Sequence, residues 1–578
     1  MNKNLGPTYP FSEETHADKY RSPGESFKDY ASRVANALKD NDEHFKLLYP
    51  ILLEQKFLPA GRIQASMGSP RETTPYNCFV SGVVEDNSDS IMDRAKEAFQ
   101  TMRLGGGIGY DFSNIRPRGD LIRTLQSRSS GPVSFMNIYD AVCATIASAG
   151  HRRGAQMGVL RVDHPDIEEF IHAKNNGMAL RNFNISVGVT DTFMEAVKNK
   201  TSFDLVFEGR VYRTVDANAL WESILRSTWD WAEPGVLFID RINKKNNLWY
   251  CETISATNPC AEQPLPPHGA CLLGSFNLTK YVEDTDNGQE FRYDTFKQDI
   301  RVVVRAMDNV VDRAVYPLPE QKKEAQSKRR MGLGVTGLAN AIELMGYPYG
   351  SPWFLAYTEA ILKTLRDTAY EASIELAKEK GPFPLFDTKM LDSAFAKTLP
   401  QSIRKDIECF GIRNSHLLSI APTGTISICA DNVSSGLEPV FSHSYNRRVK
   451  TVDGEKTEAV EDWAYRVHGV KWVTADELSV DKHVAVLNLA SVYVDSACSK
   501  TCNVGPDVSW EEFKDVYMKA YDGGASGCTT FRSAGKLMGV LSTKDEEPED
   551  SSPKVTEDFI DEGLACYFDP ETGRKACE

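Results

Sequence analysis

Residues 257–265 read Thr-Asn-Pro-Cys-Ala-Glu-Gln-Pro-Leu, which places an amide, a thiol and a carboxylate at alternate positions. In an extended backbone, side chains two positions apart share a face, so Asn258, Cys260 and Glu262 are expected to point the same way. The two prolines favour an extended path, because each fixes its own φ and keeps the preceding residue out of the helical region. Cysteine is a nucleophile or one-electron centre, glutamate a general base and asparagine an orienting hydrogen bonder. The stretch predicts a reactive loop, with a polar loop around a buried structural cysteine as the alternative.

The composition is that of a globular enzyme. The 578 residues are 41% hydrophobic and 25% charged, which leaves room for one large domain with appendages or for three ordinary domains. A formal net charge of −15 argues against a general nucleic-acid binder, although local arginines and backbone N–H groups can still hold a small phosphorylated ligand. No apolar run approaches the roughly 18 residues of a membrane span, and residues 1–20 lack a signal-peptide pattern. We therefore expect a cytoplasmic protein with neither a nucleic-acid nor a membrane partner.

Twelve cysteines are scattered along the chain. They are far too few for a disulfide-stapled secreted scaffold. Cys498 and Cys502 form a single C-x3-C spacing without the second pair that a zinc site needs, so we interpret them as structural and expect no metal site. Scattered cysteines in a cytosolic chain, several of them near polar loops, instead suggest thiol chemistry.

The pattern along the chain divides it into three parts. Residues 1–70 carry helical periodicity and no chemical motif. Strand patterns then alternate with helix patterns to about residue 450, which is typical of an α/β fold, and we assign residues 71–540 to this main domain. Residues 541–578 begin as an acidic, apolar-poor run, so we expect a flexible tail. This tail carries Cys566 and Cys577. A flexible run of about 30 residues spans roughly 30 Å, so a tethered thiol could reach the main domain; the alternative is a ragged end with incidental cysteines.

Three polar loops could approach a ligand. Residues 105–109 carry four glycines in five positions, which permits close backbone approach to a ligand, but they lack the Lys-Ser/Thr of a phosphate loop. The alternative is a helix C-cap followed by a turn. Residues 150–158 form a basic, glycine-flanked loop that suits anion sensing, with a solvated turn as the alternative. Residues 417–428 read as a buried strand ending in a Thr/Gly turn, whose hydroxyls and N–H groups can hold an anion at a helix start.

These segments together resemble the large catalytic subunit of ribonucleotide reductases. Residues 258–262, Asn-Pro-Cys-Ala-Glu, match the family's N-x-C-x-E radical loop. Asn77-Cys78 and residues 271–278, Cys-Leu-Leu-Gly-Ser-Phe-Asn-Leu, match its two active-site redox cysteines, and residues 422–427, Pro-Thr-Gly-Thr-Ile-Ser, match its phosphate turn. The similarity covers roughly residues 50–540, and several motifs in the right order are far more specific than any one of them.

The resemblance implies a fold and a reaction. The fold is a ten-stranded α/β barrel of two five-stranded parallel halves, with the Cys260 loop threaded through its centre. Cys260 becomes a thiyl radical that abstracts the ribose 3′-hydrogen, Glu262 takes the 3′-hydroxyl proton and Asn258 holds that hydroxyl. Cys78 and Cys271 then protonate the leaving 2′-hydroxyl and supply two electrons, closing a disulfide. The chain is thus expected to convert ribonucleoside di- or triphosphates into 2′-deoxyribonucleotides, the precursors of DNA.

The same matching implies binding residues and partners. Cys566 and Cys577 resemble the family's shuttle pair, which thioredoxin or glutaredoxin re-reduces, although their spacing is wide beside the family's close pairs. A homodimer is expected, with deoxynucleoside triphosphates or ATP as allosteric effectors. No N-terminal ATP cone is recognised, so on–off control by ATP and dATP is expected to be missing. The expected substrate-binding residues are Asn77, Gly107, Pro422, Thr423, Gly424, Thr425 and Ser427, and the expected effector-binding residues are Asp86, Arg116, Arg152 and Arg153.

The source of the radical can be inferred from the end of the main domain. Large subunits that receive a radical from a separate metalloprotein carry two adjacent tyrosines there. Here residues 527–533 read Gly-Cys-Thr-Thr-Phe-Arg-Ser, and no Tyr-Tyr pair occurs between residues 500 and 578. Phe531 has no O–H group, so unlike a tyrosine it cannot relay a radical by proton-coupled electron transfer.

Residues 495–501 and 528–533 instead resemble the adenosylcobalamin-dependent class II enzymes, which generate the radical by homolysis of a cobalt–carbon bond. We therefore expect adenosylcobalamin as the cofactor. One alternative is a class I-type large subunit that needs a separate, small radical-generating subunit. The other is an inactive nucleotide-binding paralogue with a regulatory role, against which intact Cys78, Cys260, Glu262 and Cys271 argue.

Overall fold

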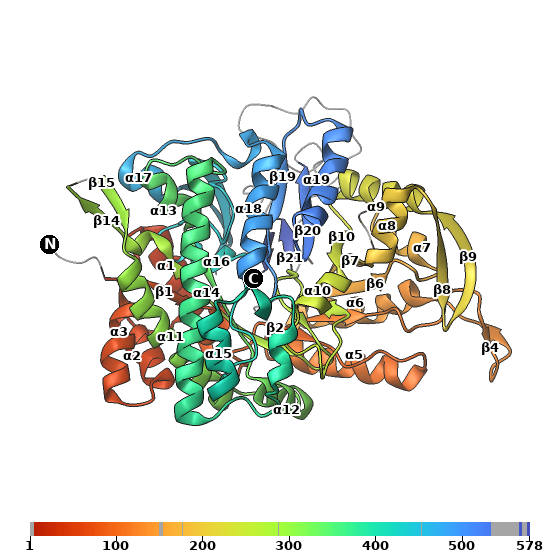
Figure 1. Ribbon diagram of the computed structural model, residues 1–578, viewed down its shortest axis with the longest axis horizontal. Helices are drawn as coiled ribbons and strands as arrows, with labels where there is room; N and C mark the ends of the chain where they lie inside the picture. The colour runs from red at the N-terminus through yellow and green to blue at the C-terminus, as the bar shows by residue number, and fades with distance from the viewer. Residues whose placement is uncertain are drawn as a thin grey trace.

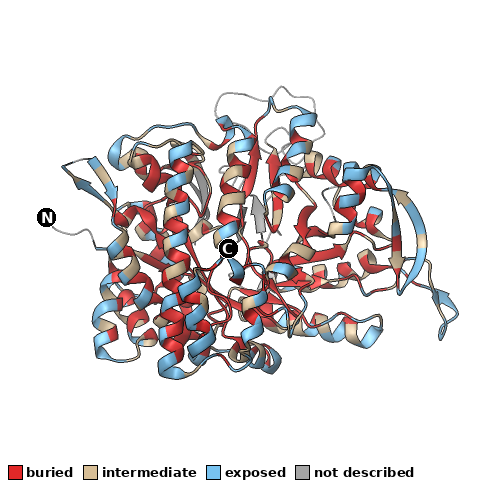
Figure 2. Ribbon diagram, in the orientation of Figure 1, coloured by how far each residue is buried: buried red, intermediate tan, exposed pale blue. Residues whose placement is uncertain are grey.

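A computed structural model describes residues 5–149, 154–175, 177, 179–286, 288–451, 454–532, 566–568 and 575–577. Helices surround a central sheet (Figure 1). The strands of that sheet are buried, whereas the outward faces of the helices are exposed (Figure 2). Within the described residues, no helix combines the length and the apolar character that a membrane crossing needs.

Three helices form the first part of the chain. They are α1 (Pro10–Tyr20), α2 (Phe27–Leu38) and α3 (Asp42–Leu53). At the start of α2, Ser26 and Asp29 form a capping box that satisfies backbone N–H groups at the helix end. The apolar residues of α2 pack into the main hydrophobic core, so the helical periodicity of this segment is explained by burial against the rest of the protein.

Ten strands of the described chain form one mixed sheet. Five neighbours, β2, β3, β6, β7 and β10, run parallel to one another. At the two ends of this group, β13 pairs antiparallel with β2, and β20 pairs antiparallel with β10. The strands are β1 (Phe57–Pro59), β2 (Cys78–Val80), β3 (Gly107–Asp111), β6 (Gln156–Arg161), β7 (Phe183–Val189), β10 (Gly235–Phe238), β13 (Ala270–Asn277), β16 (Met331–Thr336), β19 (Thr501–Val504) and β20 (Gly527–Arg532).

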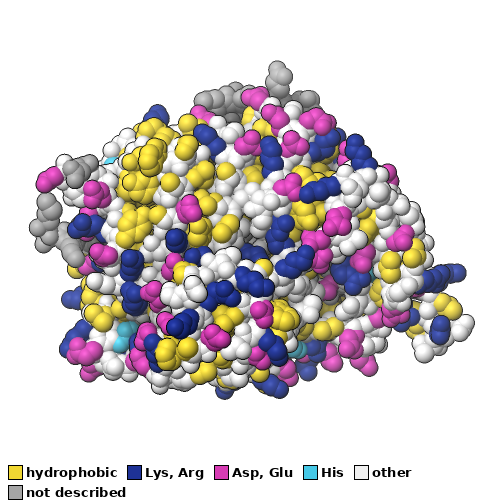
Figure 3. Space-filling view, viewed as in Figure 1, with side chains coloured by type: hydrophobic (Ala, Val, Ile, Leu, Met, Phe, Trp, Pro, Cys, Tyr) yellow, Lys and Arg dark blue, Asp and Glu magenta, His cyan; other side chains and the backbone are white. Residues whose placement is uncertain are grey.

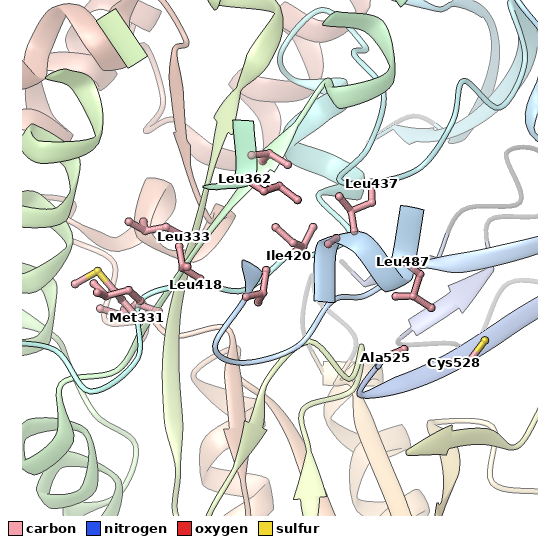
Figure 4. Packing of buried hydrophobic residues seen from close by; sticks show 14 of the residues in the cluster. Met331, Leu333, Leu362, Leu418, Ile420, Leu437, Leu487, Ala525 and Cys528 are labelled. Atoms are coloured by element: carbon pink, nitrogen blue, oxygen red, sulfur yellow. The ribbon is translucent and has the colours of Figure 1, made fainter. Parts of the chain in front are cut away.

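The remaining strands pair more loosely. β13 and β16 are parallel, as are β19 and β20. Between them, residues 417–420 form only isolated parallel bridges, from Leu418 to Leu333 and from Ile420 to Cys498. The Thr/Gly turn and helix start expected within residues 417–428 are confirmed, because Thr423 adopts a left-handed conformation with φ of 53° and α16 (Gly424–Ile428) follows at once. The expected strand before them is reduced to these isolated bridges. Figure 4 shows Leu418 and Ile420 packed among Leu333 and Leu437.

The larger helices cover the sheet (Figure 1). Their apolar residues belong to the same core as the strands. The helices after α3 are α4 (Gly61–Ser66), α5 (Ser88–Arg103), α6 (Pro132–Ala149), α7 (Ile167–Ile171), α8 (Asp191–Asn199), α9 (Ala217–Trp231), α10 (Ile239–Lys245), α11 (Tyr293–Arg313), α12 (Pro319–Lys328), α13 (Leu338–Leu344), α14 (Pro352–Lys380), α15 (Gln401–Phe410), α17 (Trp463–His468), α18 (Val480–Tyr493) and α19 (Trp510–Asp522).

In the part of the chain that the structure describes, six further strand pairs lie outside the main sheet. The described part of the tail contains two short strands that pair antiparallel, with Cys566 opposite Cys577. The pairs are β4 (Leu121–Ile122) with β5 (Ser127–Arg128), β8 (Ser202–Phe207) with β9 (Arg210–Asp216), β11 (Ala256–Thr257) with β12 (Pro264–Leu265), β14 (Val282–Thr285) with β15 (Gly288–Phe291), β17 (Ser444–Thr451) with β18 (Gly454–Glu461), and β21 (Cys566–Phe568) with β22 (Lys575–Cys577). The acidic run that begins the tail, which was expected to be flexible, lies outside the described residues.

Charges of both signs are interspersed on the surface. On the face shown in Figure 3, lysines and arginines alternate with aspartates and glutamates, and no broad basic area is visible. Together with the formal net charge of −15, this distribution provides no field on that face that would recruit a nucleic-acid backbone.

Candidate active site

The reactive loop lies at the tip of a hairpin. β11 and β12 pair antiparallel, with Thr257 opposite Pro264. The Ala261 N–H donates to the Asn258 carbonyl oxygen at 3.0 Å, which closes a β-turn with Pro259 at its second position. The extended path expected for these residues is therefore wrong. The chain must reverse between β11 and β12, and the fixed φ of proline suits that position of a turn as well as it suits a strand.

Two side chains of the hairpin converge on Cys78. Asn258 Nδ2 donates to Cys78 Sγ at 3.1 Å, and Cys78 Sγ donates to Glu262 Oε1 at 3.7 Å. The Gln263 N–H in turn donates to Asn258 Oδ1 at 2.9 Å, which fixes the orientation of the amide. All of these side chains are buried. The structure thus brings the amide of Asn258 and the carboxyl group of Glu262 together at the thiol of Cys78, whereas the predicted common face of these two residues with Cys260 stays a prediction.

Side chains from other parts of the chain hold the hairpin in place. Asn184 of β7 donates through Nδ2 to the Pro259 carbonyl oxygen at 2.9 Å. Ser419 Oγ donates to the Glu262 carbonyl oxygen at 2.9 Å, and the Ala497 N–H donates to the same oxygen at 3.1 Å. Sequence reasoning missed Asn184 and Ser419. The available signal was a polar residue within an otherwise apolar strand pattern.

The glycines of β3 lie against this hairpin. A Cβ atom on Gly109 would lie 1.7 Å from the Thr257 carbonyl oxygen, and one on Gly107 would lie 3.1 Å from Pro259 Cγ. The close backbone approach that the glycine run predicts is therefore made to the protein's own loop. Gly107, expected on the substrate side, borders the turn that carries Cys260.

Cys78 and Cys271 lie directly opposite each other on neighbouring antiparallel strands. Both are free, buried thiols. Residues in such a pair have Cα atoms roughly 4.5–5.5 Å apart, which falls within the range that a disulfide spans. The backbone can therefore accommodate a bond between the two sulfurs without rearrangement.

The two thiols experience different charges. Burial raises the pKa of both well above the ordinary value, so both are protonated at neutral pH. At Cys78 the neighbouring Glu262 carboxylate raises the pKa further. At Cys271 the Arg330 guanidinium opposes the effect of burial on the pKa, while Asp495, Glu262 and Glu324 add to it. Protonated, buried thiols suit hydrogen and proton donation.

Cys260 is disulfide-bonded in this structure. A thiol at this position therefore requires prior reduction. The residue is 6% exposed and forms part of the wall of a small hollow that is partly open to solvent. The other walls include residues 497–501 and 527–529, so the hairpin, β20 and the segment before β19 meet at this hollow.

The Thr/Gly turn lies near Cys78, because Ala421 packs against the apolar cluster that contains this cysteine. Thr423 Oγ1 accepts from the Gly436 N–H at 2.8 Å and lies 3.0 Å from Thr336 Oγ1. Ser427 Oγ lies 3.0 Å from Ser435 Oγ. These contacts fix the turn, while Pro422, Gly424 and Thr425 stay half-buried.

Asn77, beside Cys78, offers a polar atom. Its Oδ1 is buried without a hydrogen-bond partner among the described residues. A buried acceptor that lacks a partner within the protein is well placed to take a donor from a ligand.

Two of the expected effector residues contact each other. Arg116 Nε lies 2.6 Å from Asp86 Oδ2, and the Arg116 N–H donates to Asp86 Oδ1 at 3.1 Å. The pair is partly exposed. Asp86 precedes α5 in the chain, and Arg116 follows β3. Arg152 and Arg153 lie outside the described residues.

Comparison with known proteins identifies relatives over most of the chain. Residues 76–531 match the family model described as ribonucleotide reductase, barrel domain. A vitamin B12-dependent ribonucleoside-diphosphate reductase of Thermoplasma acidophilum is 34% identical over 87% of this chain and 67% of its own length. One of the same name from Mycobacterium tuberculosis is 33% identical over 82% and 69%. A vitamin B12-dependent ribonucleotide reductase of Streptomyces clavuligerus is 28% identical over 94% and 65%.

Proposed function

The chain belongs to the ribonucleotide reductase family, and we propose that it is a cobalamin-dependent member that reduces ribonucleotides to 2′-deoxyribonucleotides. The observation that carries the proposal is the convergence of Asn258, Glu262 and the Cys78–Cys271 pair around the hairpin that bears Cys260. The names of the two relatives at 33–34% identity favour ribonucleoside diphosphates as the substrate class.

The first steps use the hairpin. Cys260, once reduced, carries a thiyl radical and removes the 3′-hydrogen of the ribose. Glu262 accepts the proton of the 3′-hydroxyl group, and Asn258 orients that hydroxyl by hydrogen bonding. Their hydrogen bonds to Cys78 support these roles, because both groups lie next to the thiol that acts in the following step.

The second half of the reaction uses the opposed thiols. Cys78 gives its proton to the 2′-hydroxyl, which leaves as water. Cys78 and Cys271 then supply two electrons to the sugar and close a disulfide, while the hydrogen returns from Cys260 to the 3′-carbon. One ribonucleotide and two thiols thus yield one deoxyribonucleotide, one disulfide and one water. The opposite register of the two cysteines supports this pairing.

The residues around Cys260 fit an adenosylcobalamin site. The hollow beside this cysteine carries hydroxyl groups on Ser499, Thr501 and Thr529, which can hydrogen-bond to a ribose and an adenine. When bound, the cofactor supplies the oxidising equivalent through homolysis of its cobalt–carbon bond. On the protein side, Cys260 keeps its sulfur at the wall of the hollow, and Phe531 of β20 offers no O–H group for an alternative radical route.

The substrate-binding residues remain those expected from the motifs. We propose that Asn77, Gly107, Pro422, Thr423, Gly424, Thr425 and Ser427 bind the nucleotide, with its phosphates at the Thr/Gly turn. Asn77 Oδ1, which has no hydrogen-bond partner among the described residues, and the proximity of Ala421 to Cys78 support this assignment.

We also propose that the sheet closes into a ten-stranded barrel of two five-stranded parallel halves. One half is β2, β3, β6, β7 and β10. The bridges from Leu333 to Leu418 and from Ile420 to Cys498 support closure of the other half, because they join β16 through residues 417–420 to the segment that leads into β19. The barrel then occupies residues 71–540, after the helical segment 1–70 and before the tail 541–578.

The tail is proposed to carry electrons from a thioredoxin-type reductant. Cys566 and Cys577 are far apart in sequence, but they lie opposite each other on β21 and β22. β22 passes beside α16 at the end of the Thr/Gly turn. The wide spacing of the two cysteines is thus compatible with a shuttle pair. A homodimer with an effector site at Asp86, Arg116, Arg152 and Arg153 for deoxynucleoside triphosphates or ATP, and a cytoplasmic location, remain proposals from the family.

The decisive experiment supplies pre-reduced protein with CDP, a dithiol and adenosylcobalamin and measures deoxycytidine products. Product formed only in the presence of the cofactor is the expected result. Product that instead needs a radical-bearing metalloprotein would identify a class I-type large subunit. Intact nucleotide binding without product under either condition would identify a regulatory paralogue.

A further inference from the structure

Arg330 flanks the cysteine pair on the side away from Cys78. β13 and β16 pair in parallel with Leu272 opposite Met331, so Arg330 lies alongside Cys271 one position earlier. Because side chains alternate along a strand, the residues before Leu272 and Met331 leave the sheet on the same face. Cys271 therefore has Cys78 on one flank and Arg330 on the other.

An ion-pair cluster fixes the guanidinium in this position. Arg330 contacts Glu252 and pairs with Glu324 at 2.9 Å, while Lys328 pairs with both carboxylates at 2.8 Å. The side chains of these four residues are between 3% and 10% exposed. Two cations and two carboxylates satisfy one another in the cluster, and a buried arginine held by several hydrogen bonds keeps its charge.

The largest charge effect differs between the two sulfurs. Cys78 lies 3.7 Å from Glu262 Oε1, whereas Cys271 lies beside Arg330. Burial raises the pKa of both thiols. The Glu262 carboxylate raises the pKa of Cys78 further, whereas the Arg330 guanidinium lowers that of Cys271 against smaller raising effects of Asp495, Glu262 and Glu324. Arg330 therefore stabilises a thiolate on Cys271, and Glu262 destabilises one on Cys78.

We propose that Arg330 sets the direction in which the Cys78–Cys271 disulfide is reduced, by making Cys271 the sulfur that leaves. An incoming thiolate attacks Cys78 Sγ and forms a mixed disulfide with it. The Cys78–Cys271 bond breaks, and its electron pair goes to Cys271 Sγ as a thiolate beside the guanidinium. A second thiol of the reductant then attacks the mixed disulfide and releases Cys78. Arg330 is a positioning residue in this step, and the inference rests on the proposed redox role of the two cysteines.

Chemical trapping tests the direction of attack. The full chain with Cys566→Ser and Cys577→Ser is oxidised with diamide, and the Cys78–Cys271 disulfide is verified by peptide mapping. Limiting 2-mercaptoethanol is added, the exchange is stopped in acidic denaturant containing N-ethylmaleimide, and the adducts are located by mass spectrometry. We expect mercaptoethanol on Cys78 and maleimide on Cys271, in about tenfold excess over the reverse, because exchange favours departure of the less basic sulfur.

Arg330→Met should slow reduction of this disulfide about tenfold and bring the ratio of mercaptoethanol on Cys78 to mercaptoethanol on Cys271 towards one. Arg330→Lys should restore part of the reduction rate and part of this ratio. Arg329→Met is the matched control. Arg329 is also buried but pairs with Asp308 and Asp312, so its loss should lower Tm without changing the adduct ratio.

The outcomes separate the inference from the function. A disulfide that forms but takes the adduct on Cys271, or on both sulfurs equally, overturns the inference and leaves the function standing. A chain in which Cys78 and Cys271 never form a disulfide, either with diamide or during turnover, overturns both the inference and the proposed redox pair. If Arg330→Met does not fold, the chain with native Arg330 still tests the inference, because mercaptoethanol on Cys78 supports it and mercaptoethanol on Cys271 overturns it.

Discussion

Gly109→Ala should disable the enzyme while leaving its fold in place. Gly109 lies within β3, where the backbone suits any residue. An added Cβ would lie 1.7 Å from the Thr257 carbonyl oxygen, whereas real Cβ contacts are essentially never shorter than 3.0 Å. The hairpin must therefore move by about 1.3 Å, and Cys260 lies three residues beyond Thr257. Because a displacement of about 1 Å at a reacting centre lowers rates about 10²-fold, we expect kcat to fall at least about 100-fold.

Steady-state reduction of CDP with saturating adenosylcobalamin, together with Tm, measures this effect. The KM for CDP should change little, because the proposed phosphate turn, residues 422–427, lies outside both β3 and the hairpin. Gly188→Ala on β7 of the same sheet is the matched control, since its Cβ would meet Val159 Cγ1 at an ordinary 3.5 Å. Gly107→Ala, at 3.1 Å from Pro259 Cγ, should be intermediate. A folded Gly109→Ala protein with kcat within twofold of wild type would refute the argument that β3 positions the hairpin.

Three further predictions follow from the site and the core. Cys260→Ser should abolish turnover without weakening nucleotide binding, whereas Cys409→Ser, at an exposed free thiol, should behave as wild type; steady product from Cys260→Ser would exclude the radical role. Truncation before Cys566 should remove thioredoxin-driven turnover but spare a single turnover by pre-reduced protein, and full thioredoxin-driven activity would show that the tail cysteines are incidental. Burial lowers the pKa of His16 from 6.5 to about 3, so the folded state binds fewer protons than the unfolded state between these values. The stability that neutral His16 contributes is present above pH 6.5 and is lost as pH falls below it, by roughly 2 kcal/mol at pH 5. The decrease in Tm between pH 7 and pH 5 should therefore be smaller in His16→Gln, and an equal decrease in both proteins would contradict this assignment.

Short-range motifs identified the chemistry of the site but not the shape of its central loop. Residues 257–265 were expected to be extended, because proline is common in strands and in turns and no local pattern separates the two. The antiparallel pairing of β11 with β12 makes the residues between them a turn. The glycine run of β3 was expected to approach a ligand, and in the structure Gly109 approaches Thr257 of the hairpin.

Contacts across strands could not be inferred from sequence spacing. The opposition of Cys78 and Cys271 depends on the register of β2 and β13, and the flanking position of Arg330 depends on the register of β13 and β16. Such registers are set by the whole core rather than by local sequence. Family motifs supplied the first pair, since both cysteines belong to them. Arg330 belongs to no motif quoted from the sequence, so only the fold brings it to the site.

The central claim is that Cys260 receives the radical in a cobalamin-dependent reaction. The most direct test incubates pre-reduced protein with adenosylcobalamin tritiated at C5′ and measures tritium in water. Hydrogen that reaches a thiol exchanges with solvent, so wild type and Cys409→Ser should release tritium and Cys260→Ser should not. Release from Cys260→Ser at the wild-type rate, or deoxyribonucleotide formation by wild type without any release, would contradict the claim.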